Sequence, residues 1–452
     1  MSTQIKYYQD YPSISTIFNL FKEDDYAAFL DSSLVNELGH FSIIGIDPYL
    51  IIESSENSVK LNHEVVNQTV EEILNEQLIN DFTPTVAGLP ITKGALGFYS
   101  YDYGRKIMGV PTRHKDEIGM NDAIFCFYDT FIIEDHHKKQ LAIVCNGKLS
   151  STNDRLEALE QIILTTNSEN YVPANQNLSQ PVITTNMAKD AYISAIEKVV
   201  NYIYEGDIYV MNLTRQLQIK SDITPFDLFR KLRRINPSPF GGYLNYPEFQ
   251  IVSSSPERFM KIENREITTR PIKGTRKRGQ TPEEDELLRQ DLANSEKEKS
   301  ELLMVVDLER NDLNKICQAG SVKVPNLFSI EPYATVFHLV ADVTGTLKKE
   351  ISSVDAILSA SPGGSITGNP KFRAMEIIDE LEKSRRGLYT GSIGYFSLDG
   401  NCDFNIVIRT AVAKDGCFHL GVGGGLTYES DPIDEFEETN QKAKAIIESF
   451  KN

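Results

Sequence analysis

The run Thr268–Gly279, TTRPIKGTRKRG, is the stretch on which the interpretation of this 452-residue chain depends. Lys273 lies between an isoleucine and a glycine in a run whose composition otherwise indicates a turn. Gly274 tolerates backbone angles that other residues avoid, and the cationic residues 276–278 are expected to lower the pKa of the lysine. A lysine in this setting is a candidate amine nucleophile. The alternative is a basic surface loop, since most lysines are solvated.

Composition describes a globular chain with a strongly acidic balance. Apolar residues make up 40% of the sequence and charged residues 24%, with a net charge of −18. The length predicts two or three domains, or one large composite fold. The negative charge disfavours a nucleic-acid partner, so an anionic substrate would need a local metal, an arginine or backbone N–H groups.

The cysteines and the apolar runs indicate the compartment. The five cysteines are scattered and show no CxxC spacing, which disfavours zinc or a disulfide framework and fits a reducing cytosol. The first residues are polar, and no uninterrupted apolar run approaches the roughly 18 residues of a membrane span. We therefore expect a soluble cytoplasmic protein with no membrane association.

Residues 1–165 are predicted as a strand-rich N-terminal region. Residues 166–186 are polar and lack an apolar period, so they are predicted as a linker. Gly94–Gly104 is predicted as a close-packed turn or a bulged strand. The expected strands are Tyr26–Asp31, Phe41–Ile46, Leu50–Ser54, Ala123–Ile133 and Gln140–Cys145.

Residues 187–450 are predicted as a second domain of mixed helices and strands. Met187–Glu205 has an amphipathic helical pattern, which Gly206 ends. No strict alternation of strand and helix is present, so the predicted fold class is α+β. Further helices are expected over Pro282–Asp312, Pro370–Leu381 and Asp434–Phe450, and a strand over Phe404–Val412.

Two of these helices carry acidic pairs at helical spacing. Glu298 and Glu301 are three residues apart, as are Glu435 and Glu438, so each pair shares one helix face. If the two helices face each other, the four carboxylates form an oxygen-only site suited to Mg²⁺. The alternative is that each pair lies on a solvated helix face.

Other segments are candidates for anion binding or proton transfer. Pro362–Pro370 and Gly421–Gly425 are glycine-rich and can point backbone N–H groups at a carboxylate or phosphate, or simply form turns. Arg409, within an apolar run, needs an anion, which a substrate carboxylate or a structural salt bridge would supply. His338 is a candidate proton carrier near neutral pH or a core histidine.

Together these stretches resemble the chorismate-utilising enzymes: anthranilate synthase component I, aminodeoxychorismate synthase component I and the isochorismate and salicylate synthases. The match is close over about residues 187–450 and looser over 1–150. It implies a large composite fold of antiparallel sheets packed as a sandwich with flanking helices. The matching motifs, in family order, are Ser255–Phe259 (SPERF), Pro271–Thr275 (PIKGT), Leu303–Asp312 (LMVVDLERND), Gly320–Pro325 (GSVKVP), Pro362–Ala374 (PGGSITGNPKFRA), Gly391–Tyr395 (GSIGY), Ile408–Thr410 (IRT) and Glu435–Thr439 (EFEET).

Within this family, Lys273 selects the branch. The aminodeoxychorismate synthases resemble this chain in reading PIKGT, whereas anthranilate synthases usually carry alanine at the lysine position. The resemblance implies that Lys273 adds to C2 of chorismate as the 4-hydroxyl leaves, and that ammonia then displaces it to give 4-amino-4-deoxychorismate, toward p-aminobenzoate and folate. Splitting one substitution into two is covalent catalysis. The open alternatives are anthranilate synthase component I, isochorismate synthase and a non-catalytic scaffold that binds a glutaminase.

The resemblance also implies roles at the other matching positions. Glu257 is expected to act as an acid/base partner and His338 to lie near the leaving group. The expected Mg²⁺ ligands are Glu301 and Glu438, supported by Glu298 and Glu435. Chorismate is expected to contact Gly274, Thr275, Ser365, Tyr389, Arg409, Gly423, Gly424, Gly425 and Lys442.

One departure from the family pattern concerns the nucleophile. In the stretch Tyr209–Asn212, Val210 stands where the family usually has glutamine and where the isochorismate and salicylate synthases use a water-activating lysine. Valine cannot activate water, which counts against that branch and leaves open how ammonia is held. No cysteine lies in the G-x-C-x-G turn of a glutamine amidotransferase, so a separate glutaminase subunit is expected to supply ammonia as a heterodimer partner.

The N-terminal half resembles the part of the family that binds tryptophan, either as an inhibitor or as a structural ligand. The chain itself contains no tryptophan, and Gly241 replaces a bulkier family residue, so an altered or empty pocket stays open. The expected pocket residues are Ser32, Leu38, Gly39, His40, Phe41, Pro239, Phe240 and Gly241.

Overall fold

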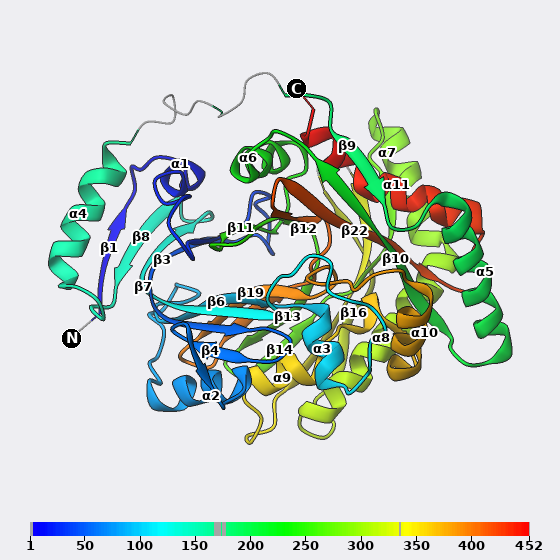
Figure 1. Cartoon of the computed structure of the whole chain (residues 1–452), viewed down its shortest axis with the longest axis horizontal. Helices are drawn as coiled ribbons and strands as arrows, with labels where there is room; N and C mark the ends of the chain where they lie inside the picture. Colours follow the sequence, from blue (N-terminus) through cyan, green and yellow to red (C-terminus); the bar gives the residue numbers. More distant parts are fainter. Residues whose placement is uncertain (1–2, 167–172, 174–177, 334–335, 452) are drawn as a thin grey trace.

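The computed structural model describes residues 3–166, 173, 178–333 and 336–451, and Figure 1 shows strands through its interior with helices around the margin. Every strand pairing in the described part is antiparallel, and hydrogen bonds connect the strands into one network. This arrangement confirms the predicted α+β class and the large composite antiparallel fold. The helices are α1 (Ile14–Phe18), α2 (Val70–Asn80), α3 (Tyr101–Ile107), α4 (Thr152–Leu164), α5 (Lys189–Glu205), α6 (Pro225–Ile235), α7 (Pro282–Asn294), α8 (Glu296–Ile316), α9 (Ser353–Ala360), the 3₁₀ turn η2 (Gly364–Ile366), α10 (Lys371–Leu381) and α11 (Pro432–Ser449).

The strands of the N-terminal region form a layer around two long partners. β3 (Phe41–Ser54) pairs with β7 (Ala123–Asp135) along nearly its whole length, with one bulge near Pro48. Almost every side chain of β7 is buried, because both faces of this layer are covered, and its sequence is therefore apolar without alternation. The other strands of the region are β1 (Gln4–Tyr8), β2 (Ala28–Asp31), β4 (Val59–Leu61), β5 (Glu64–Val66), β6 (Gly94–Tyr99) and β8 (Gln140–Cys145).

Two paths of paired strands lead from this layer into the C-terminal half. One passes from β2 through β11 (Phe240–Asn245), β12 (Gln250–Ser255), β21 (Thr410–Lys414) and β22 (Cys417–Leu426) to β10 (Val210–Lys220). The other passes from β6 through β19 (Ser392–Ser397), β20 (Cys402–Asn405), β13 (Arg258–Glu263), β14 (Glu266–Thr269) and β17 (Val336–Thr346) to β15 (Ile272–Lys277). The two paths end on strands that line the candidate site described below. The remaining strands are β9 (Val182–Thr185), β16 (Lys323–Pro332) and β18 (Gly368–Asn369).

Part of the predicted linker is a strand. β9 pairs with β10, although residues 166–186 carry no apolar period that would predict a strand. All four β9 side chains are exposed, so the pairing uses backbone hydrogen bonds at a sheet edge. Residues 167–172 and 174–177 of this segment lie outside the described residues, and the division into two domains stays a prediction.

Capping residues set the bounds of the helices near the site. α5 ends at Gly206, whose φ of 84° is the left-handed conformation that glycine tolerates. The segment predicted as one long helix over Pro282–Asp312 is two helices, α7 and α8, because Ser295 is extended there and caps α8 by accepting from the Glu298 N–H. Asp431 caps α11 in the same way.

Three other segments differ from the predictions. The expected loop 268–279 contains β15, whose alternation is interrupted by a bulge at Gly274. The expected strand Phe404–Val412 is broken between β20 and β21, where Arg409 has a φ of 52°. Gly94–Gly104 is neither a turn nor a single strand: β6 is followed by α3, which Ser100 caps.

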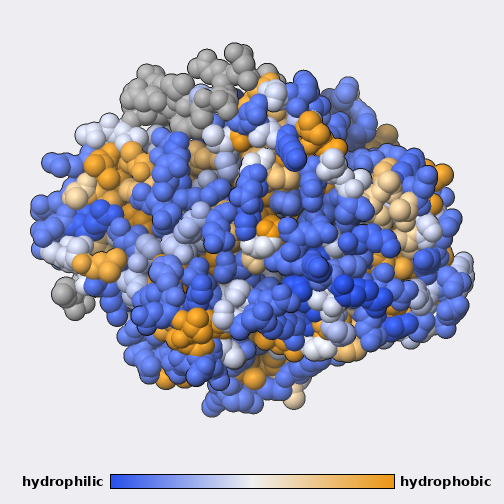
Figure 2. All heavy atoms as spheres, viewed as in Figure 1, coloured by the Kyte–Doolittle hydropathy of each residue, from blue (hydrophilic) through white to orange (hydrophobic). Residues whose placement is uncertain are grey.

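Hydrophilic residues cover most of the face seen in Figure 2, with small apolar patches between them. None of the helices in the described residues is long and apolar enough to cross a bilayer.

Candidate active site

A cavity of about 710 Å³ lies where β15, β22, α8 and α11 meet. Its wall includes every residue that the sequence predicts for catalysis, for chorismate binding and for Mg²⁺, although these residues are spread from Glu257 to Lys442. The two acidic pairs therefore face one space, although the Glu438 side chain is half exposed.

Lys273 reaches across this cavity from β15 to the glycine-rich strand β22. Its Nζ is 2.9 Å from the position that a Cβ atom on Gly425 would take. Gly274 has a φ of 70°, and the register of β15 shifts between Lys273 and Thr275. A Cβ on Gly274 would meet the Glu298 carboxylate at 2.9 Å, so both glycines leave room for charged side chains.

Two of the three cationic residues that follow Lys273, Arg276 and Arg278, are paired with carboxylates. Arg276 contacts Asp291 at 2.6 Å and Glu298 at 3.2 Å, and Arg278 contacts Asp285 at 2.6 Å. The charges of the two arginines are therefore largely balanced, so neither acts as a free cation beside Lys273, whereas Lys277 lines the cavity and the expectation for it stays a prediction.

Glu257 is a buried acid at the floor of the cavity, just beyond β12. Burial raises its pKa to about 7, although Lys273 and a hydrogen bond from Ser365 act in the opposite direction. The Ser365 hydroxyl donates to the carboxylate at 3.2 Å. A carboxyl group with this pKa can both donate and accept a proton near neutral pH, as the predicted acid/base role requires.

His338 lies on β17 opposite Thr275, and its Nδ1 is 3.0 Å from the threonine hydroxyl. Burial lowers its pKa to about 4, and Arg409 contributes in the same direction. The imidazole is therefore neutral near pH 7, which argues against a proton carrier that titrates near neutrality, and the catalytic role of His338 stays a prediction. A neutral imidazole still offers one hydrogen-bond donor and one acceptor.

Arg409 is not in the middle of a strand but in the break between β20 and β21. Its side chain forms no ion pair with any carboxylate of the described residues, and burial lowers its pKa. A partly buried guanidinium without a protein anion is suited to a substrate carboxylate. Nearby, the Tyr389 ring occupies the space beside Gly421, where a Cβ atom would be 2.1 Å from the ring.

The four predicted metal ligands come from α8 and α11, and each has a protein partner. Glu438 contacts Lys442 at 2.5 Å, Glu301 contacts Lys297 at 4.0 Å, and Glu435 accepts from Ser430 at 2.7 Å. Glu298 is paired with Arg276, as described above.

These carboxylates have the chemistry of a Mg²⁺ site but are not arranged as one. Burial raises the pKa of Glu301 and Glu435, whereas for Glu438 the effect of burial is outweighed by Lys442 and Lys273, which keep its pKa below the ordinary value. Within the described residues, no three His, Cys, Asp or Glu side chains stand as a ready metal site. Carboxylate oxygens suit a hard divalent cation, so the donor set fits once Lys442 moves from Glu438.

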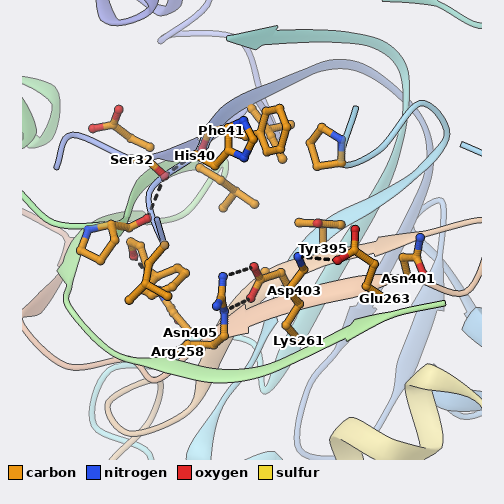
Figure 3. Close-up of a pocket in the computed structure, with 18 of the residues that line it drawn as sticks. Ser32, His40, Phe41, Arg258, Lys261, Glu263, Tyr395, Asn401, Asp403 and Asn405 are labelled. Carbon is orange, nitrogen blue, oxygen red and sulfur yellow. Dashed lines mark hydrogen bonds and ion pairs between the residues drawn. The ribbon is translucent and has the colours of Figure 1, made fainter. Parts of the chain in front are cut away.

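A second cavity, of about 420 Å³, lies between β2, β11 and β13 (Figure 3). All the residues predicted for a tryptophan pocket line it except Gly39, where a Cβ atom would collide with the Leu34 carbonyl. The Ser32 hydroxyl is 2.8 Å from the carbonyls of both Phe41 and Pro239, so it fixes the wall. A Cβ on Gly241 would be 3.0 Å from two oxygen atoms, which leaves little space for a side chain there.

Two pairs of opposite charges line this second cavity. Arg258 forms a two-pronged pair with Asp403 at 2.9 Å, and Lys261 contacts Glu263 at 2.8 Å (Figure 3). The His40 and Phe41 rings stack, with centroids 3.9 Å apart, and supply flat surfaces.

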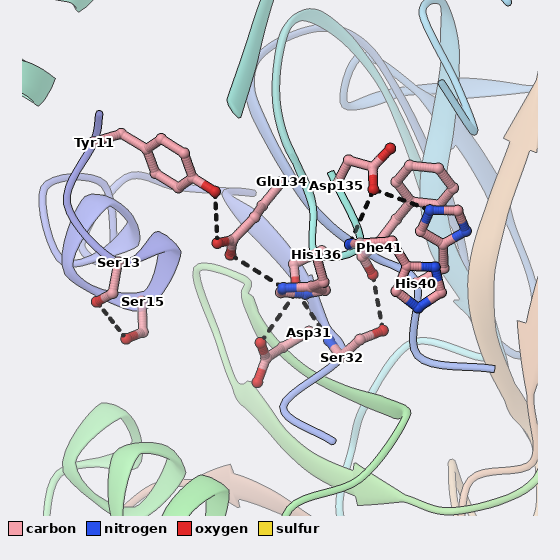
Figure 4. A network of polar contacts seen from close by, with 12 residues as sticks. Tyr11, Ser13, Ser15, Asp31, Ser32, His40, Phe41, Glu134, Asp135 and His136 are labelled. Atoms are coloured by element: carbon pink, nitrogen blue, oxygen red, sulfur yellow. Dashed lines mark hydrogen bonds and ion pairs between the residues drawn. The ribbon is translucent and has the colours of Figure 1, made fainter. Parts of the chain in front are cut away.

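A polar network behind this wall was not predicted from the sequence (Figure 4). The Tyr11 hydroxyl donates to Glu134 at 3.1 Å, and the Ser42 hydroxyl lies 2.8 Å from His136. Ser42 also lies 3.3 Å from Asp31, which is buried on β2. These contacts join β2, β3 and β7, and their long sequence separation left no local signal.

Among the polar residues that line the active-site cavity, three had been assigned no role: Asn212, Lys297 and Gln441. Asn212 closes the stretch in which Val210 departs from the family pattern. Side chains two residues apart in a strand share a face. The two-residue spacing between Val210 and Asn212 is therefore a signal from which Asn212 could have been predicted as a site residue.

Comparisons with known proteins identify the family of this chain. The family model described as chorismate binding enzyme matches residues 29–448. Anthranilate synthase component 1 of Acetivibrio thermocellus is 36% identical, over 98% of this chain and 94% of its own. Aminodeoxychorismate synthase component 1 of Bacillus subtilis (strain 168) is 37% identical, over 90% of this chain and 88% of its own. The crystal structure of anthranilate synthase component I from Streptococcus pneumoniae TIGR4 superposes with a TM-score of 0.81 at 30% identity, over 92% and 93% of the two chains. Relatives of both names are similarly close, so overall similarity does not separate the two activities.

Proposed function

The chain belongs to the chorismate-binding enzyme family, and we propose that within it the protein converts chorismate and ammonia to 4-amino-4-deoxychorismate, the activity of aminodeoxychorismate synthase component I. One observation carries this proposal. The amine of Lys273 lies inside the cavity beside Gly425, and its charge interacts with the buried acid Glu257. An amine nucleophile with an acid/base partner in reach is the arrangement that covalent substitution requires.

The reaction proceeds as two substitutions. In the first, the neutral amine of Lys273 bonds to C2, the C4–O bond breaks, and the 4-hydroxyl leaves as water with the proton of Glu257. In the second, ammonia bonds to C4, the C2–N bond to Lys273 breaks, and the Glu257 carboxylate takes a proton from the new ammonium group. Chorismate and ammonia thus become product and water, and Lys273 and Glu257 return to their starting forms.

Other residues of the cavity hold the substrate. Arg409, which has no protein anion, pairs with a chorismate carboxylate, and the backbone of Gly423–Gly425 allows close approach of the ring. Neutral His338, held by Thr275, offers a hydrogen bond near the leaving hydroxyl. Glu301 and Glu438, with Glu298 and Glu435, would hold Mg²⁺, which when bound supplies positive charge beside a substrate carboxylate.

The ammonia source is a separate glutamine amidotransferase subunit that forms a heterodimer with this chain. The component 1 naming of both groups of relatives supports this partner, as does the absence of a glutaminase cysteine motif in the sequence. The product serves p-aminobenzoate and folate synthesis in the cytoplasm.

Product identification tests the activity. The protein is incubated with chorismate, ammonium and Mg²⁺, and the product is analysed with and without a separate lyase. We expect 4-amino-4-deoxychorismate alone, and p-aminobenzoate once the lyase is added. Anthranilate fluorescence without lyase would instead identify an anthranilate synthase, and turnover without ammonium an isochorismate synthase. Lys273→Ala is the control, and a variant with unchanged properties would favour the scaffold hypothesis.

Mass spectrometry tests the covalent step. In the absence of ammonia, the peptide that carries Lys273 should gain the mass of chorismate less one water. An unmodified lysine under conditions of turnover would indicate direct attack by ammonia.

We also propose that the second cavity binds tryptophan. The stacked rings of His40 and Phe41 and the paired polar groups around Arg258 support an aromatic amino acid there. Because the chain contains no tryptophan, indole fluorescence of the purified, denatured protein reports bound ligand directly. A preparation without indole that also fails to take up added tryptophan in equilibrium dialysis would contradict this proposal.

A further inference from the structure

Asn212 lies next to the proposed nucleophile, on the same face of the sheet. On β10 it is directly opposite Gly425 of β22 in the antiparallel ladder. Residues opposite each other in such a ladder point to the same face, with Cβ atoms about 4.5–5.5 Å apart. Since the Lys273 amine is 2.9 Å from the Cβ position of Gly425, the Asn212 side chain and this amine are neighbours in the cavity.

The side-chain amide of Asn212 has no partner in the described part of the chain. Its Oδ1 is buried without a hydrogen bond, and no described residue bonds to its Nδ2. The backbone, by contrast, is held on both sides: the N–H donates to the Thr367 carbonyl at 2.7 Å, and the carbonyl accepts from Arg386 at 2.7 Å. A buried acceptor without a hydrogen bond is costly in free energy. The backbone of Asn212 is fixed while its carboxamide has no protein partner, which indicates that the carboxamide binds a ligand.

The chemistry of the second substitution defines that ligand. Ammonia attacks with its single lone pair, so its three N–H groups must be held by acceptors that do not remove a proton. A neutral amide oxygen beside Lys273 meets this need. Val210, at the position where the family usually has glutamine, is buried and is not among the residues that line the cavity.

We propose that Asn212 binds the incoming ammonia, with its Oδ1 accepting a hydrogen bond from the nucleophile and directing the lone pair toward the ring carried by Lys273. This inference rests on the proposed function and identifies the nitrogen-binding part of the same site. Rotation of the carboxamide turns the oxygen toward the cavity without moving the backbone.

Steady-state kinetics with ammonium chloride as the sole nitrogen source test the inference. Asn212→Leu keeps the approximate size of the side chain and removes the acceptor. We expect the KM for ammonium to rise about tenfold, the effect of one lost hydrogen bond, while the KM for chorismate stays within about twofold. The Lys273 adduct should still form at the normal rate without ammonia, since the first substitution does not use Asn212.

Gln216→Leu is the matched control. Gln216 lies on the same strand and the same face, and its Oε1 is also buried without a partner, but it is not among the residues that line the active-site cavity. Its replacement should leave the KM for ammonium unchanged. Asn212→Ala is the second variant if leucine prevents folding.

The outcomes separate the two proposals. An unchanged KM for ammonium in the Asn212 variants would overturn the inference and leave the proposed function intact. A rise confined to the KM for chorismate would also overturn it, because Asn212 would then contact the substrate. If the unaltered protein forms no Lys273 adduct and no aminated product, the proposed function fails and the inference fails with it.

Discussion

The Nζ of Lys273 lies 2.9 Å from the point that a Cβ atom on Gly425 would occupy. Lys273 belongs to β15, the last strand of one path from the N-terminal layer, and Gly425 to β22, the strand before the end of the other path. The lysine is therefore placed by the meeting of two distant parts of the fold, and the glycine is the residue that leaves space for its amine.

Gly425→Ala should displace this amine and disable the enzyme with little effect on stability. The added methyl group would push the flexible end of Lys273 aside, and a misplacement of about 1 Å can cost about 100-fold in rate. We expect kcat to fall by about that factor, whereas the free energy of unfolding should change by less than about 1 kcal/mol. Kinetics and thermal unfolding measure the two effects.

A double variant provides the control for this prediction. In a Lys273→Ala background, Gly425→Ala should cause no further loss, because the displaced group is already absent. An additive loss would mean that the methyl group acts on the substrate rather than on the lysine.

The active site was more predictable than the elements that carry it. Helical spacing pairs Glu298 with Glu301, and the family resemblance implies that Glu301 and Glu438 bind the same ion, although spacing alone left open whether the two helices meet. The break at Arg409 was not predictable, since its left-handed φ depends on tertiary contacts within an apolar run that favours a strand. β15 was taken for a loop because the bulge at Gly274 interrupts the alternation of side chains between the two faces of the strand.

Other features were missed because nothing local encodes them. α1 and β1 are short, and their stability comes from packing against strands more than a hundred residues away, as in the pairing of Tyr8 with Leu141. The lowered pKa of His338 could not be predicted from the sequence either. It results from burial and from the charge of Arg409, which only the folded chain brings close to the imidazole.

Glu257 should set an alkaline limit on activity. Burial raises its pKa to about 7, so the protonated form that assists the leaving hydroxyl is lost as the pH rises through 7. We expect kcat/KM for chorismate to fall above about pH 7, and Glu257→Gln to lower the rate and abolish this limb. A profile from pH 5.5 to 9 measures both effects. If the limb persists in the Gln variant, another group controls it.

Glu309, outside the cavity, should make the fold less stable at alkaline pH. It is buried on α8, accepts from the Thr269 hydroxyl at 2.7 Å, and burial raises its pKa to about 8. Between the ordinary carboxyl pKa and 8, the folded chain binds more protons than the unfolded chain, so the free energy of unfolding falls by up to about 1.4 kcal/mol per pH unit. Urea unfolding at pH 6 and pH 8 should show this loss in the unaltered protein.

The Glu309→Gln variant isolates that contribution. Glutamine keeps an acceptor for Thr269 and cannot ionise, so its free energy of unfolding should decline less between pH 6 and 8. Equal declines in the two proteins would show that Glu309 ionises in the folded state as easily as in the unfolded state.

Lys442 should compete with Mg²⁺ for Glu438. The ammonium group lies 2.5 Å from the carboxylate, so a metal ion at this oxygen must displace it. Lys442→Met removes the competing cation, and we expect the affinity of the substrate-free protein for Mg²⁺ to rise about tenfold, as about 1.4 kcal/mol of released competition would give. Glu301→Gln and Glu438→Gln should each lower the affinity. Isothermal titration calorimetry measures the binding without reference to turnover.

Lys444→Met is the matched control for the charge change. Lys444 lies on the same helix and pairs with Glu448 at 3.9 Å, also four residues apart, but neither residue lines the cavity. Its replacement changes the net charge equally, so a general electrostatic effect on Mg²⁺ would appear in both variants. A rise in affinity restricted to Lys442→Met would place the metal at Glu438, whereas equal rises would mean that the lysine affects the ion only through the overall field. No rise in either would remove Glu438 from the ligands of the substrate-free enzyme.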